Sequence, residues 1–132
     1  MDKRVLVADV PEVQARVAAV LARDRVVFVH TLATALDALG GADFDLVLIG
    51  LHFDDSRMFD LVREVRAGRR NQAVPIVCWR MRPFAFPISM HVIEVTVKAL
   101  GAQSFADLAA HATEADGNAA LALLVAAATA PG

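Results

Sequence analysis

Apolar residues form short runs that alternate with segments of helical spacing along most of the chain. Five of these runs are rich in Val, Ile and Leu and predict β-strands. The run at 46–49, Leu-Val-Leu-Ile, is apolar throughout, which is typical of a strand covered on both faces of a parallel sheet. We therefore expect strands at 4–8, 26–29, 46–49, 76–79 and 104–106.

The segments between these strands carry helix signals. Pro11 suits the first position of a helix, and Thr31 is a candidate N-cap. Gly40 and Gly41 end the second predicted helix and Gly68 ends the third. Strands that alternate with helices predict an α/β fold of three layers around a five-stranded parallel sheet, in one domain over 1–130. We expect helices at 11–21, 32–39, 56–67, 89–100 and 118–128.

Composition narrows the class of protein. The chain has 132 residues, is 57% hydrophobic and has a mean hydropathy of +0.50. No uninterrupted apolar run reaches the ~18 residues of a membrane span, and the N-terminus lacks a cleavable signal pattern, so we expect a cytoplasmic protein that makes no membrane contact. The single cysteine, Cys78, lies in an apolar run and predicts a buried structural thiol.

Charge is distributed unevenly. The net charge is −2, yet from Pro83 onward only five residues are charged, and none follows Asp116. Such a surface favours contact with a partner, so the C-terminal half is the predicted interaction surface. The balance of acidic and basic residues argues against nucleic-acid binding. The four histidines lack metal-ligand spacing, and we expect no metal site and no cofactor.

Three segments carry a resemblance to a known family. The run FDLVLIGLHFDDSRMFDLVREVR, from Phe44 to Arg66, resembles the third strand and helix of response-regulator receiver domains. RVLVADVPEV near the start and ALGAQSF, from Ala99 to Phe105, are similar to two further parts of that family. The resemblance implies a flavodoxin-like receiver (βα)5 fold over nearly the whole chain.

The resemblance also implies where the phosphorylation site would lie. The phosphoacceptor aspartate falls on Gly50, the hydroxyl position on Arg80 and the lysine position on Leu108, while Phe105 stands at the switch-aromatic position. The acidic pair that holds Mg²⁺ in the family is reduced to Asp9. Glycine has no side chain to accept a phosphoryl group, so these positions predict a degenerate site with no catalytic residue, and we expect no enzyme.

Several polar residues near this site have open interpretations. Asp9 is either a polar residue at the open edge of the sheet or a residual metal ligand. Arg80 either pairs with Asp9 in the old phosphate pocket or is a solvated surface residue. Asp54 and Asp55 either form a solvated loop and help to cap the third helix, or serve as displaced phosphoacceptors.

The interaction surface has candidate residues of its own. The segment RMRPFAFPIS, before the fourth helix, carries Phe84 and Phe86, which either dock a partner or fold onto the core. Val95 and Leu124 lie in the apolar helices at 89–100 and 118–128. In receiver domains, these two helices and the strand between them form the usual dimerisation face, so we expect a homodimer or another protein partner there.

Together these features predict a stand-alone pseudo-receiver in bacterial signal transduction, of the two-component and phosphorelay class, that acts by phosphorylation-independent protein–protein interaction. One alternative is a flavodoxin-like small-ligand-binding domain or enzyme, with its ligand at the strand ends where Asp9, Gly50, His52 and Arg80 converge. Another is an atypical receiver phosphorylated at a displaced aspartate.

Overall fold

The fold is built on one sheet of five parallel strands. The structure, a computed structural model, describes residues 3–83 and 88–130. The strands lie in the order β2-β1-β3-β4-β5, which is the doubly wound arrangement in which β1 sits beside both β2 and β3. All five predicted strands are confirmed: β1 (Arg4–Ala8), β2 (Arg25–Val29), β3 (Leu46–Gly50), β4 (Ile76–Arg80) and β5 (Ser104–Asp107).

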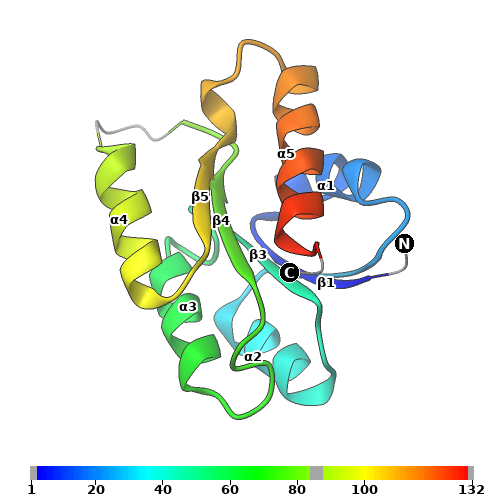
Figure 1. Cartoon of the computed structure of the whole chain (residues 1–132), viewed down its shortest axis with the longest axis vertical. Coiled ribbons are helices and arrows are strands. Elements are labelled where there is room, and N and C mark those ends of the chain that lie inside the picture. Colours follow the sequence, from blue (N-terminus) through cyan, green and yellow to red (C-terminus); the bar gives the residue numbers. More distant parts are fainter. Residues whose placement is uncertain (1–2, 84–87, 131–132) are drawn as a thin grey trace.

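Helices cover both faces of the sheet and complete a three-layer (βα)5 fold (Figure 1). Helices α1 and α5 lie on one face, and α2, α3 and α4 lie on the other. In the described part of the chain, no helix is both long and apolar enough to cross a bilayer. The helices are α1 (Gln14–Val20), α2 (Leu32–Gly41), α3 (Met58–Ala67), α4 (Met90–Leu100) and α5 (Glu114–Ala128), with 3₁₀ turns at Pro11–Val13 and Leu108–Ala110.

Alternation along the strands divides the core into two clusters. Val5 and Val7 of β1 face the cluster under α1 and α5, while Leu6 and Ala8 face the cluster under α2, α3 and α4. Every residue of β3 is buried, as expected for the central strand of a parallel sheet. The face of the sheet to which a side chain points at the end of a strand can therefore be read from the alternation along that strand.

Helix boundaries follow the local sequence apart from the starts of α1, α3 and α5. The helix predicted from residue 11 begins as the 3₁₀ turn Pro11–Val13 and becomes α-helical only at Gln14. Thr31 is the N-cap of α2, since its hydroxyl accepts a hydrogen bond from the backbone N–H of Thr34 at 3.2 Å. Helix α3 begins at Met58, two residues later than predicted, because residues 54–56 adopt positive φ angles that a right-handed helix excludes. Helix α5 begins at Glu114, four residues earlier than predicted, because the hydroxyl of Thr113 caps it.

Candidate functional site

The carboxyl ends of three adjacent strands bring Asp9, Gly50 and Trp79 into one row. Ala8 of β1 pairs with Ile49 of β3, so the next residue, Asp9, continues the register beside Gly50. Gly50 in turn pairs with Trp79 of β4. Strand alternation places these positions on the same face of the sheet, under α1 and α5.

Asp9 is a buried carboxylate with both oxygens engaged. The residue is only 3% exposed. Its Oδ1 accepts a hydrogen bond from the backbone N–H of Val10 at 2.7 Å, and its Oδ2 accepts one from the indole Nε1 of Trp79 at 2.7 Å. Burial raises the pKa of Asp9 above its ordinary value, while these two hydrogen bonds and the charges of His52 and Arg82 oppose the rise. The carboxylate is thus held inside the fold rather than presented to solvent.

Gly50 leaves the space that this carboxylate fills. A Cβ atom at residue 50 would lie 2.1 Å from both Cγ and Oδ2 of Asp9, and 2.4 Å from Oδ1. Contacts below 3.0 Å are essentially never seen for a Cβ atom. The carboxyl group of Asp9 therefore occupies the volume that any side chain at residue 50 would need.

Arg80 is directed away from this row, contrary to the hypothesis that it pairs with Asp9. Its Nε and Nη2 donate to the two carboxylate oxygens of Asp107 on β5, at 2.9 and 2.8 Å. The reason is strand alternation, because Arg80 follows Trp79 and so projects from the opposite face of β4. Arg80 is not a solvated residue either, since its side chain is 16% exposed in this bidentate pair.

The lysine and switch-aromatic positions, at and after β5, both hold apolar core residues. Leu108 lies in the 3₁₀ turn after β5 and packs in the cluster under α1 and α5. Phe105 of β5 is buried in the other cluster, together with Ile93 and Val97 of α4. The lysine position therefore carries no cation, and the switch-aromatic position carries a ring that faces inward.

The acidic loop after β3 is tied to a different helix from the one predicted. The Oδ2 of Asp54 accepts a hydrogen bond from the backbone N–H of Leu32 at 2.8 Å, so Asp54 caps α2 rather than α3. Asp55 is exposed, and both residues have positive φ angles. Nearby, the Nε2 of His52 lies 3.0 Å from the backbone carbonyl oxygen of Arg82.

No metal centre is found among residues 3–83 and 88–130, since these hold no group of three or more His, Cys, Asp or Glu side chains placed to share an ion. Asp9 is the acidic residue of the row, and both its oxygens already accept hydrogen bonds. Within the row, Mg²⁺ would therefore meet one engaged carboxylate in place of the cluster of oxygen ligands that it prefers.

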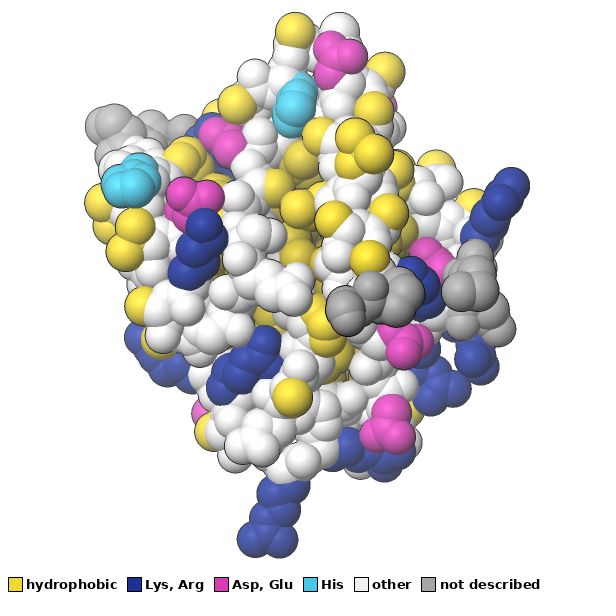
Figure 2. Space-filling view, in the orientation of Figure 1, with side chains coloured by type: hydrophobic (Ala, Val, Ile, Leu, Met, Phe, Trp, Pro, Cys, Tyr) yellow, Lys and Arg dark blue, Asp and Glu magenta, His cyan; other side chains and the backbone are white. Residues whose placement is uncertain are grey.

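The predicted interaction residues differ in their exposure. Val95 is 52% exposed on α4, whereas Leu124 is half-buried against the core and its neighbour Leu123 is 74% exposed. Phe84 and Phe86 lie outside the described residues. Figure 2 shows hydrophobic side chains at the edge formed by α4 and over α5. On α4, the exposed apolar residues are Ile88 just before the helix, Val92, Val95 and Ala99.

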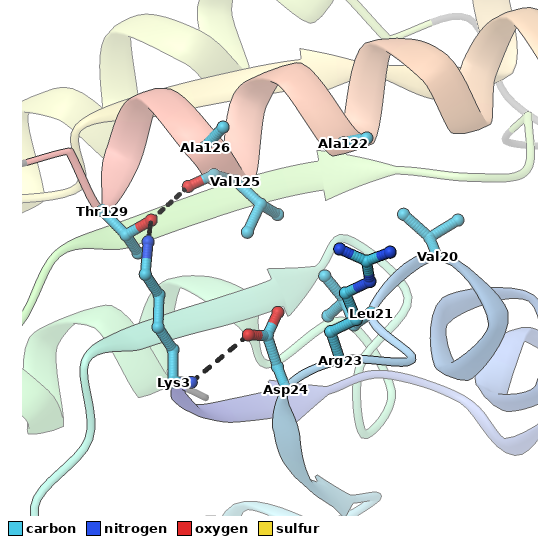
Figure 3. A pocket seen from close by; sticks show the side chains of 9 residues that line it. All are labelled: Lys3, Val20, Leu21, Arg23, Asp24, Ala122, Val125, Ala126 and Thr129. Carbon is cyan, nitrogen blue, oxygen red and sulfur yellow. Dashed lines mark hydrogen bonds between the residues drawn. The ribbon is translucent and has the colours of Figure 1, made fainter. Parts of the chain in front are cut away.

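A recess of about 290 Å³ lies on the side of the sheet where the strands begin, remote from the row (Figure 3). The end of α1, the loop before β2 and the last turns of α5 form its walls. The ammonium group of Lys3 donates to the hydroxyl of Thr129, and the backbone N–H of Lys3 donates to Asp24 at 3.3 Å. Two of its three charged residues therefore already have partners within the chain.

Trp79 is the site residue that the sequence analysis did not identify. It stands at the end of an apolar strand and reads as a core residue, which it also is, with no exposed surface. The available signal was its indole N–H, because a buried indole requires a hydrogen-bond acceptor. Asp9 is the buried acidic residue at the same end of the sheet and supplies that acceptor.

Comparisons with known proteins show which solved structures have a similar fold. No protein-family model matches the chain, and no curated protein matches it in sequence. Solved structures that share its fold include several response regulators. A putative response regulator from Chloroflexus aurantiacus aligns with a TM-score of 0.79 and 15% identity, over 99% of this chain and 100% of that chain.

Two further structures give the same result. The phosphorylated cyanobacterial phytochrome response regulator RcpA aligns with a TM-score of 0.78 and 14% identity, over 96% of this chain and 93% of that chain. The receiver domain of RstA from Klebsiella pneumoniae aligns with a TM-score of 0.68 and 23% identity, over 92% of this chain and 97% of that chain. This chain therefore has the receiver-domain form of the flavodoxin-like (βα)5 fold.

Proposed function

We propose that this protein is a pseudo-receiver that takes part in bacterial signal transduction through protein–protein contact and without phosphorylation. One observation carries the proposal: the carboxyl group of Asp9 fills the volume of a side chain at residue 50, where the resemblance places the phosphoacceptor. Arg80, which stands at the hydroxyl position, is engaged with Asp107, and Leu108 replaces the lysine. The groups that would receive and bind a phosphoryl group are thus replaced.

The exposed face of α4 supports a role in binding. Helix α4 already packs on its own domain through Ile93 and Val97, yet it exposes a second apolar stripe on its outer side. Within the helix the stripe consists of Val92, Val95 and Ala99, whose spacings of three and four residues are the pattern of a helix-packing seam, and the exposed Ile88 precedes the helix. A second copy of the chain can cover this stripe and the exposed Leu123 of α5 symmetrically.

The extent of the surface does not by itself require a partner. The accessible surface is 6967 Å², close to the about 6,700 Å² expected for a monomer of this mass. The case for a partner rests instead on where the exposed apolar residues lie. A standard interface buries about 800 Å² on each partner, which α4 and α5 together have the length to provide.

Incubation with acetyl phosphate and Mg²⁺, followed by intact-mass spectrometry, tests the proposal. A receiver domain that keeps its acceptor aspartate serves as the positive control. We expect no gain of a phosphoryl group by the present protein. A Mg²⁺-dependent gain of one phosphoryl group overturns the proposal, and its loss in Asp54→Asn or Asp55→Asn identifies a displaced acceptor. A thermal shift with nucleotides or flavins, in contrast, favours a ligand-binding domain.

A further inference from the structure

The row of Asp9, Gly50 and Trp79 contains a hydrogen bond that spans three strands. Asp9 follows β1 and Trp79 lies on β4, and β3 runs between them. Neighbouring strands are about 4.8 Å apart, so β1 and β4 are separated by roughly 10 Å. The bond from the indole Nε1 to Oδ2 of Asp9, at 2.7 Å, therefore crosses directly over β3.

The residue of β3 in this row determines whether the bond can form. That residue is Gly50, and a Cβ atom there would lie 2.1 Å from Cγ of Asp9. Any other amino acid at residue 50 would stand in the path of the bond between Asp9 and Trp79. The hydrogen bond between Asp9 and Trp79 therefore requires glycine at residue 50. The glycine has this structural role in addition to removing the acceptor side chain.

Trp79 supplies the constraint that keeps Asp9 in this path. The indole has no exposed surface, so water cannot satisfy its N–H, and Asp9 is its acceptor. The second oxygen of Asp9 is held by the backbone N–H of Val10. No buried side-chain nitrogen or oxygen among the described residues lacks a hydrogen-bond partner. The bond between Trp79 and Asp9 therefore satisfies both buried polar groups at these strand ends.

We propose that Trp79 is the positioning residue of this site: its indole N–H draws the Asp9 carboxylate across β3 and thereby makes glycine obligatory at residue 50. The contact ties the end of β1 to the end of β4 without any ligand. Arg80, the next residue of β4, reaches Asp107 on β5 from the same strand end.

The stability cost of one substitution, compared with and without the indole N–H of Trp79, tests this positioning role. Gly50→Ala is introduced into the wild type and into Trp79→Phe, and stability is measured by urea unfolding. In the wild type the new methyl group competes with a carboxylate that Trp79 holds in place. In Trp79→Phe the ring remains but the N–H is gone, so Asp9 is free to turn aside. We expect Gly50→Ala to lower the folded-to-unfolded ratio about tenfold less in Trp79→Phe than in the wild type.

Gly40→Ala is the matched control. A Cβ atom at Gly40 meets no atom within 4 Å, so its effect should be the same in both backgrounds. An equal cost of Gly50→Ala in both backgrounds overturns the proposal, because a purely structural tryptophan would not change that cost.

A second measurement needs only the wild-type protein and keeps the proposal testable if Trp79→Phe does not fold. Trp79 is the only tryptophan, so the ¹⁵N-labelled protein gives a single indole N–H resonance. We expect this proton to exchange with solvent as slowly as the amides of the central strands. Exchange at the rate of an indole free in water overturns the proposal.

Discussion

Restoring the acceptor residue, Gly50→Asp, is the most informative single substitution in this protein. The new Cβ atom would lie 2.1 Å from Cγ and Oδ2 of Asp9, where at least 3.0 Å is required. The carboxyl group of Asp9 must therefore move by about 0.9 Å or more, and hydrogen bonds of 2.7 Å to Trp79 and Val10 do not survive such a shift in good geometry.

The expected cost follows from these contacts. A hydrogen bond to a charged group contributes about 1.5–3 kcal/mol, and a buried donor left without a partner costs about 1–3 kcal/mol. Two carboxylates in contact also repel each other, which raises the pKa of one of them. We expect Gly50→Asp to lower the free energy of unfolding by about 3–5 kcal/mol, a large part of the about 5–15 kcal/mol typical of a domain.

Urea unfolding of Gly50→Asp beside Gly40→Asp measures this cost. Gly40 is exposed and has open space around it, so the control should lose about 1 kcal/mol or less. The double variant Asp9→Gly with Gly50→Asp should recover part of the loss, because the new carboxylate at residue 50 can accept from Trp79. A Gly50→Asp protein as stable as the wild type would refute the steric argument.

Three further predictions follow from other parts of the structure. Val95→Glu should weaken the proposed homodimer by about tenfold or more, whereas Val27→Glu on the distant edge strand β2 should not; a clean monomer in sedimentation velocity of the wild type contradicts the homodimer. Burial raises the pKa of Asp9 above 3.8, so the native state keeps this proton to higher pH than the unfolded chain does. The stability of the wild type should therefore fall relative to Asp9→Asn as the pH rises from 3.8 to the raised pKa. A stability difference that is constant across this range contradicts the shift. Burial raises the pKa of Cys78 to about 12, so a thiol reagent should label this residue only in the unfolded protein, and rapid labelling under native conditions would show that β4 opens.

The strands and most helices were predictable because their signals are local. Runs of Val, Ile and Leu determine the strands, and Thr31 and Gly68 mark helix ends through their own capping and backbone properties. The late start of α3 was not predictable from such rules, because Asp54 and Asp55 have positive φ angles and Asp54 accepts a hydrogen bond from Leu32 of α2, a contact between residues far apart in the chain. The start of α5 did have a local signal, in the spacing of Thr113 and Asp116.

Only part of the site could be predicted from the sequence. The resemblance located Asp9 and Gly50, but the contact between them depends on the register of three strands that are far apart in the chain. The same register decides that Trp79 faces Asp9 and that Arg80 faces Asp107. Knowledge of which face each residue of β4 occupies would have favoured Trp79 over Arg80 as the partner of Asp9.

The most direct test of the account is an NMR titration of the ¹⁵N-labelled wild type with beryllofluoride and Mg²⁺, a mimic of the phosphoryl group. The backbone amide of Gly50 and the indole N–H of Trp79 report on the two sides of the bond that closes the site. We predict that neither resonance moves at concentrations that saturate a receiver domain with an intact acceptor. Saturable shifts of both resonances, together with shifts along α4, would show that the site still receives a phosphoryl group and would contradict the account.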